Sequence, residues 1–376
     1  MNYCQFRNDF IKRMANAGTA ADVWESIVNT VTSNSGKTYT DSTSLGYNFD
    51  NTTRKYFGSI LAPNGCIYGI PTAVSQVCKY DPTNDNVTLF GNLGTSDLKW
   101  QGGCLAPNGC IYGIPLNSSA VLKIDPTTDT VTTFGNVGSS TLKWYGGILA
   151  PNGYIYGLPR RAGSVLKINP ANDTVTTFGT VETKSNTDMW FGGTLAPNGC
   201  VYCSPASATY VLKIDTNTDS ITQVGSSLGN ATNKWECGVL AANGYIYGFP
   251  TSGATSILKI NPANDTVTTF GNVGSLLYGG GSLAPNGCIY VAPIDLAANS
   301  KVMKIDPSND SISYINTSIP GGSTGSSYLT NLAIANDGKM YALPANGYRV
   351  LCIDPGSSVC NNFSAEARLS RYINHY

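Results

Sequence analysis

Charge is scarce in this chain of 376 residues. Only 12% of the residues are charged, and 23 Lys and Arg balance 23 Asp and Glu, so the formal net charge is +0. A nucleic-acid-binding protein normally presents a basic face, and this composition therefore predicts no nucleic-acid partner. Glutamate is especially rare, because only Glu182 and Glu236 occur between residues 36 and 363.

Histidine and long apolar runs are also missing. The one histidine is His375. Cys200 and Cys203 have the spacing of half a zinc site, but residues three apart on a strand point to opposite faces. We therefore expect no zinc centre. No apolar run approaches the roughly 20 residues that span a bilayer. The N-terminus mixes charges into its apolar positions and lacks a signal-peptide core. We expect no metal, no cofactor, no membrane span and synthesis in the cytoplasm, with later assembly into a particle left open.

Seven copies of one short pattern run through the chain. Each has Asn-Gly or, once, Asp-Gly, with a Tyr three residues after the Gly and a Pro three residues after the Tyr. The glycines are Gly65, Gly109, Gly153, Gly199, Gly244, Gly287 and Gly338. They lie 44, 44, 46, 45, 43 and 51 residues apart, a period typical of four-stranded propeller blades.

The third repeat shows how one blade is built. Residues 145–150 read as a short innermost strand that contains glycines because such strands converge on an axis. Three further strands follow, over residues 154–158, 164–168 and 174–178, and Asn-Gly and Asn-Pro sequences turn the chain between them. The sequence therefore predicts an all-β fold, a seven-bladed β-propeller of four-stranded blades, with a small α-helical N-terminal appendage.

We divide the chain into an appendage (residues 1–35), a propeller (residues 36–363) and a tail (residues 364–376) with a possible short helix. The blades are expected to begin near residues 56, 100, 144, 190, 235, 278 and 329. In blade seven, either residues 357–363 or residues 37–41 supply the outer strand. The second arrangement joins the two ends of the chain and removes a weak seam, and we favour it slightly.

Several residue types recur at fixed positions of the blade, and we interpret them as structural. The second-strand tyrosines have an apolar body that fits between blades, and four cysteines after Asn-Gly read as small buried residues. The third-strand lysines predict a Lys–Asp pairing within or between blades. These lysines are Lys79, Lys123, Lys167, Lys213, Lys259 and Lys304. The aspartates that end the next turn are expected to form that turn; they are Asp85, Asp129, Asp173, Asp219, Asp265 and Asp310.

The blade consensus, Gly-Gly-x-Leu-Ala-Pro-Asn-Gly-x-Ile-Tyr-Gly-x-Pro followed by Val-Leu-Lys-Ile-Asp-Pro, resembles the repeats of the YVTN, NHL and virginiamycin-B-lyase-like propeller families. The resemblance covers residues 56–355 and implies the propeller fold. For the lyases it also implies a metal-assisted active site with a catalytic histidine. The repeats here contain no histidine, so this departure argues against lyase chemistry, and we expect no enzyme.

An aromatic residue precedes the innermost strand in six blades, and basic residues accompany it. The aromatic residues are Tyr56, Trp100, Trp144, Trp190, Trp235 and Tyr278, and the basic ones on the same face are Lys55, Lys99, Lys143, Lys234, Arg160 and Arg161. One interpretation is a ring at the channel mouth that binds glycans or anions by stacking and cation–π contacts. The other is that these aromatics fill the gaps between blades.

Because a ligand site usually breaks symmetry, the positions that depart from the repeat are informative. They are Gln101, Phe191, Glu236 and the loops over residues 160–163, 204–210 and 293–300.

The N-terminal appendage reads as two short amphipathic helices, which are not stable alone. Their apolar stripes are Phe6, Phe10 and Met14, then Trp24, Ile27, Val28 and Val31. They must dock on the propeller itself or on a protein partner. We therefore expect a non-enzymatic interaction or structural protein tethered through its termini to a larger assembly, such as a virion or surface layer. The alternative is a glycan- or anion-binding propeller, and a lyase-like enzyme is the third hypothesis.

Overall fold

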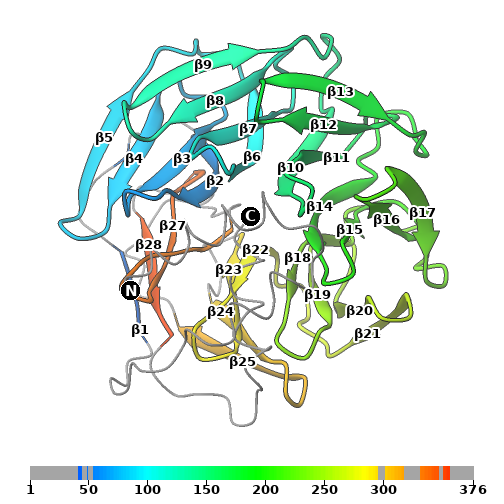
Figure 1. Ribbon diagram of the computed structural model, residues 1–376. Coiled ribbons are helices and arrows are strands. Elements are labelled where there is room, and N and C mark those ends of the chain that lie inside the picture. The colour runs from blue at the N-terminus through cyan, green and yellow to red at the C-terminus, as the bar shows by residue number, and fades with distance from the viewer. Residues whose placement is uncertain are drawn as a thin grey trace.

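The computed structural model describes residues 41–44, 49, 54–294, 301–316, 331–346 and 350–355. The described part is a ring of seven four-stranded antiparallel sheets around one axis (Figure 1). This confirms the predicted seven-bladed β-propeller. The predicted helices over residues 1–35 and the tail over residues 364–376 lie outside the described residues. Within the described part, no helix has the length and apolar character needed to cross a membrane.

The innermost strands surround the axis and begin, in six blades, at the aromatic residue that marks the repeat. They are β2 (Tyr56–Leu61), β6 (Trp100–Leu105), β10 (Trp144–Leu149), β14 (Trp190–Leu195), β18 (Trp235–Leu240), β22 (Tyr278–Leu283) and β26 (Ala333–Ile334). In each of the first six, a bulge adds one residue. In β6, for example, the register passes from Trp100↔Pro115 to Gly103↔Gly113.

Glycine is needed at this bulge for two reasons. Gly102 has φ 69°, a left-handed conformation that other residues rarely adopt. A Cβ on Gly102 would also lie 2.8 Å from the Cα of Gly146 in the next blade. The inner strands therefore approach as closely as backbone allows, as the glycine content predicted.

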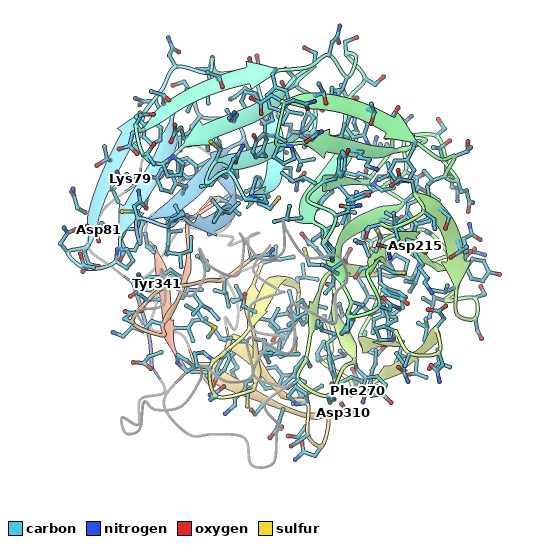
Figure 2. The ribbon with its side chains drawn as sticks, in the orientation of Figure 1. Lys79, Asp81, Asp215, Phe270, Asp310 and Tyr341 are labelled. Atoms are coloured by element: carbon cyan, nitrogen blue, oxygen red, sulfur yellow. The ribbon has the colours of Figure 1, made fainter. Side chains whose placement is uncertain are left out.

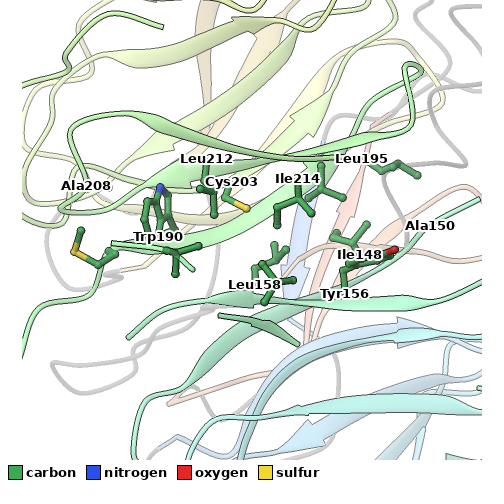
Figure 3. Packing of buried hydrophobic residues seen from close by; sticks show 14 residues of the cluster. Ile148, Ala150, Tyr156, Leu158, Trp190, Leu195, Cys203, Ala208, Leu212 and Ile214 are labelled. Carbon is green, nitrogen blue, oxygen red and sulfur yellow. The ribbon is translucent and has the colours of Figure 1, made fainter. Parts of the chain in front are cut away.

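The second strand of each blade is buried along its whole length because neighbouring blades cover both of its faces. These strands are β3 (Ile67–Pro71), β7 (Ile111–Pro115), β11 (Ile155–Pro159), β15 (Cys200–Pro205), β19 (Ile246–Pro250), β23 (Ile289–Pro293) and β27 (Met340–Ala342). Figure 3 shows one such interface, in which Tyr156 and Leu158 of blade three face Trp190 and Leu212 of blade four. Because both faces are apolar, blades stack rather than expose a side.

The third strands alternate between buried apolar residues and half-buried lysines. They are β4 (Val77–Asp81), β8 (Val121–Asp125), β12 (Val165–Asn169), β16 (Val211–Asp215), β20 (Ile257–Asn261), β24 (Lys301–Asp306) and β28 (Leu351–Asp354). The outer strands form the rim, and those of the first six blades are largely exposed. They are β5 (Asn86–Phe90), β9 (Thr130–Phe134), β13 (Thr174–Phe178), β17 (Ser220–Val224), β21 (Thr266–Phe270), β25 (Ser311–Asn316) and β1 (Asp41–Ser44).

A hydrogen-bonded lock joins each of five blades to the next. The second-strand tyrosine lies opposite the third-strand lysine in the register, and both donate to one aspartate in the outer turn of the following blade, as Tyr112 and Lys123 do to Asp173 at 2.7 and 2.6 Å. The other four acceptors are Asp129, Asp219, Asp265 and Asp310. Figure 2 shows Asp310 beside Phe270, at the rim. The Lys–Asp pairing thus runs between blades.

The ring closes through the N-terminal segment. Strand β1 pairs antiparallel with β28, from Asp41↔Asp354 to Ser44↔Leu351. The favoured alternative is therefore confirmed, with the described strand starting at Asp41, where the predicted one ended. Blade seven has no lysine for such a lock, because Cys352 lies opposite Tyr341 where the other blades have lysine. The pairing of β1 with β28 supplies the outer strand of this blade from the other end of the chain.

Candidate functional site

The predicted aromatic ring is packed into the fold. Each of its six members is at most 4% exposed. The four indole N–H groups donate to the carbonyl that precedes the third strand of the same blade, as Trp144 does to Ser164 at 2.8 Å. A ligand cannot reach these ring faces without opening the blade. This burial agrees with the interpretation that the aromatics fill the gaps between blades. It argues against ligand stacking, which stays a prediction.

The lysines beside these aromatics are also buried. Lys143 donates to the carbonyls of Leu116, Ser118 and Ser140 at 3.2, 3.0 and 2.8 Å, and Lys99 and Lys234 make equivalent contacts. Burial lowers the pKa of all three amines to about 8. Lys55 is buried at the same repeat position. These cations hold loops of neighbouring blades together and present no basic surface.

Blade four departs from this arrangement. Met189 stands where blades one, two, three and five have the lysine. The preceding Asp188 pairs with two arginines of the blade-three loop. Arg160 Nη2 and Arg161 Nε lie 2.8 and 2.5 Å from the Asp188 carboxylate. Although burial raises the pKa of Asp188, the hydrogen bonds from Arg160 and Arg161 hold it below its ordinary value. Blade four therefore has a carboxylate held by two arginines where those four blades have a buried lysine.

The Arg160 guanidinium also contacts residues of the two adjacent blades. Its Nη1 donates to Gln101 Oε1 of blade two at 3.0 Å. Its carbon atom lies 5.3 Å from the ring centre of Phe191 and 5.9 Å from that of Tyr145, within cation–π range. One side chain therefore links blades two, three and four.

Glu236 completes the cluster from blade five. Its carboxyl is buried and accepts a hydrogen bond from the Tyr145 hydroxyl. Burial raises the pKa of Glu236 to about 7, although Tyr145 and Arg160 both lower it. Burial and the nearby Glu236 also raise the pKa of the Tyr145 hydroxyl. Gln101, Tyr145, Arg160, Asp188, Phe191 and Glu236 form what we call the axial cluster.

A cavity follows the axis from this cluster. It is lined by the glycines of the inner strands with side chains that include Phe57, Gln101, Tyr145, Thr194 and Asn331. Cys237 also lines it, in a left-handed conformation (φ 47°) where blades one to four have glycine. Burial and Glu236 raise the pKa of its thiol. No group of three or more His, Cys, Asp or Glu side chains is placed to hold a metal within the described ranges.

Two buried polar side-chain atoms in the described part of the chain have no hydrogen-bond partner, and both belong to this region. They are Arg160 Nε in the axial cluster and Oγ1 of Thr194, a residue that lines the cavity although this atom is buried. Such atoms are rare in folded proteins. The repeat elsewhere satisfies its buried polar groups, so these exceptions mark the axis as chemically distinct.

The structure brings together residues that the sequence had singled out as departures from symmetry. Gln101, Phe191, Glu236 and Arg160 come from four blades and meet on one axis. Asp188 and Thr194 were missed. The signal for Asp188 was the loss of the lysine at Met189, and the signal for Thr194 was a hydroxyl where most blades have an apolar residue or cysteine.

Comparison with known proteins agrees on the fold. A family model described as "Repeat of unknown function (DUF6923)" matches residues 147–295, and no curated protein matches the chain. Among solved structures, streptogramin B lyase superposes with a TM-score of 0.67 at 12% identity, over 84% of this chain and 98% of the lyase. Virginiamycin B lyase from Staphylococcus aureus gives 0.67 and 12%, over 84% and 99%.

An extracellular domain of a hybrid two-component system from B. thetaiotaomicron gives a TM-score of 0.62 at 11% identity, over 84% of this chain and 42% of that chain. The resemblance to virginiamycin-B-lyase-like propellers is therefore confirmed for the fold. Identities this low show the fold alone, and a shared fold does not establish a shared function.

Proposed function

We propose that this chain is a non-enzymatic binding propeller whose ligand site is the axial cavity beneath the axial cluster. The observation that supports this proposal is the convergence of departures from symmetry. Blades repeat one set of packing and locking contacts, whereas the residues that break the repeat come from four blades and meet on the axis. Propellers built of repeats commonly use their central channel in this way.

The arrangement of acid–base groups supports binding rather than catalysis. Glu236 has the raised pKa that a general acid or base needs. Its carboxyl, however, accepts from Tyr145 and does not line the cavity. The site is therefore built to hold a ligand unchanged. Attachment of residues 1–35 to a larger assembly stays a separate prediction, since those residues lie outside the described ranges.

A thermal-shift screen tests this function. Uncharged, anionic and cationic small molecules and short peptides are added to the full chain and, in parallel, to a Gln101→Leu variant, which changes a polar side chain that lines the cavity. We expect at least one class of compound to raise the Tm of the native chain more than that of the variant, and mass spectrometry to recover it unchanged. A screen in which no compound distinguishes the two proteins, or in which the bound compound is converted, contradicts the proposal.

A further inference from the structure

The axial cluster holds two guanidinium groups against one ionised carboxylate. Arg160 Nη2 and Arg161 Nε lie 2.8 and 2.5 Å from the Asp188 oxygens, and the side chains of Arg160 and Asp188 are only 16% and 12% exposed. While Glu236 carries its proton, the cluster therefore has one cation in excess. When Glu236 loses that proton, two cations face two carboxylates.

Arg160 is the cation that can change partners. Arg161 holds Asp188 through its own Nε, so Asp188 keeps an ion pair when Arg160 moves. Arg160 Nη1 donates to a neutral amide, Gln101 Oε1, at 3.0 Å, and its buried Nε has no hydrogen-bond partner among the described residues. A buried donor without a partner is costly. The present arrangement therefore leaves Arg160 with capacity for a further acceptor.

Glu236 is close enough for Arg160 to act on it. Tyr145 contacts both groups, since its hydroxyl donates to Glu236 and its ring centre lies 5.9 Å from the Arg160 guanidinium carbon. Arg160 is also the charged group that lowers the pKa of Glu236 against the effect of burial. A buried carboxylate without a cation is strongly destabilising. Ionised Glu236 therefore attracts the guanidinium.

The strands packed against β18 bring no charge to Glu236. These strands are β14, β15, β19 and β22, and they contain no Lys, Arg, Asp, Glu or His. Burial raises the pKa of their thiols and phenols, which stay neutral near pH 7; they are Cys200, Tyr202, Cys203, Tyr247 and Tyr278. Lys234, just before β18, donates to the carbonyls of Ala208 and Ala231.

We propose that the axial cluster is a proton-driven switch at the axial cavity: when Glu236 loses its proton, Arg160 leaves Gln101 and pairs with Glu236, while Arg161 keeps Asp188. Gln101 and Tyr145 both line the cavity, so the switch changes how two side chains of the lining are held. The raised pKa of Glu236, about 7, sets the change near neutral pH. That a bound ligand senses the change rests on the proposed function, whereas the switch itself does not.

Carboxyl NMR of the full, ligand-free chain tests the switch, because the sequence contains only four glutamates: Glu25, Glu182, Glu236 and Glu366. The glutamate side chains are labelled with carbon-13, and the signal that is missing in Glu236→Gln belongs to Glu236. We expect this signal to titrate with a midpoint near pH 7. The Arg160 Nε–H signal and the Gln101 side-chain amide signals should move with the same midpoint, and should stay still in Glu236→Gln.

Arginine variants test the exchange of partners. Arg160→Met removes the moving cation, so the midpoint of Glu236 should rise by about one pH unit or more. Arg161→Met leaves Asp188 dependent on Arg160 and should raise the midpoint as well. Arg54→Met is the matched control, because it removes an exposed arginine from another ion pair, and it should leave the midpoint unchanged.

Arg160 and Gln101 signals that do not move as Glu236 titrates, or a midpoint that Arg160→Met does not raise, would overturn the inference. Should Arg160→Met not fold, the Arg160 and Gln101 signals of the native chain decide alone. The thermal screen separates this inference from the proposed function. If the signals move and no compound binds, the function fails and the switch stands; if a compound binds and the signals do not move, the switch fails and the function stands.

Discussion

Thr194→Val should stabilise the unliganded protein. Valine has nearly the shape of threonine, so the apolar contacts are kept while the unpartnered Oγ1 is removed. An unsatisfied buried hydroxyl costs about 1–3 kcal/mol. We therefore expect the free energy of unfolding to rise by about 1–2 kcal/mol.

The same substitution elsewhere in the blade provides the control. Thr216 is equally buried, but its hydroxyl donates to the Gly199 carbonyl at 2.7 Å. Thr216→Val should therefore destabilise the protein by about 1 kcal/mol. Urea unfolding followed by circular dichroism measures both. If Thr194→Val destabilises the protein as Thr216→Val does, the Thr194 hydroxyl has a structural partner and the reasoning is refuted.

Three further predictions concern the lock, the axial cluster and the termini. Asp173→Ala removes both acceptor oxygens of one lock and replaces a residue that tolerates φ 54°. Urea unfolding should show that the free energy of unfolding falls by about 3 kcal/mol in this variant and by about 1 kcal/mol in Asp173→Asn. Equal losses in the two variants would contradict the lock. Burial raises the pKa of Glu236 to about 7, so the folded state holds a proton that the unfolded state releases near pH 4–5. Stability should therefore fall, on the order of 3 kcal/mol, as pH rises from about 4.5 to 7; an unchanged slope in Glu236→Gln would assign the effect elsewhere. Deleting residues 1–35 should leave a folded propeller that no longer associates with its assembly, and unchanged light scattering would argue against tethering. Deleting residues 1–45 should also destabilise blade seven, because it removes β1.

The fold was predictable because the repeat encodes local geometry many times over. Asn-Gly turns, a proline after the second strand and glycines in the innermost strand each specify one feature of a blade, and their period specifies the ring. Ring closure by β1 was only favoured, since residues 41–44 pair with a strand about 300 positions away. Local sequence carries little information about such a pairing.

The candidate site was only partly predictable. Repeated aromatics such as Trp144 look the same in sequence whether they pack or bind, and it is the burial of Trp144 and its bond to Ser164 that favour packing. Departures from the repeat were the better guide, because Gln101, Phe191 and Glu236 do converge. That Thr194 has no partner depends on three-dimensional packing and could not be read from the sequence.

Modification of Cys237 tests the central claim, that the axial cavity is a ligand site, most directly. The thiol lines the cavity, whereas Cys110 lies at a half-exposed turn outside it. The full chain is treated with methyl methanethiosulfonate, with and without a saturating amount of the tightest-binding compound from the screen, and both sites are quantified by peptide mass spectrometry. The account predicts that the compound slows modification of Cys237 at least about tenfold and leaves Cys110 unchanged. Equal rates at Cys237 with and without the compound would contradict it.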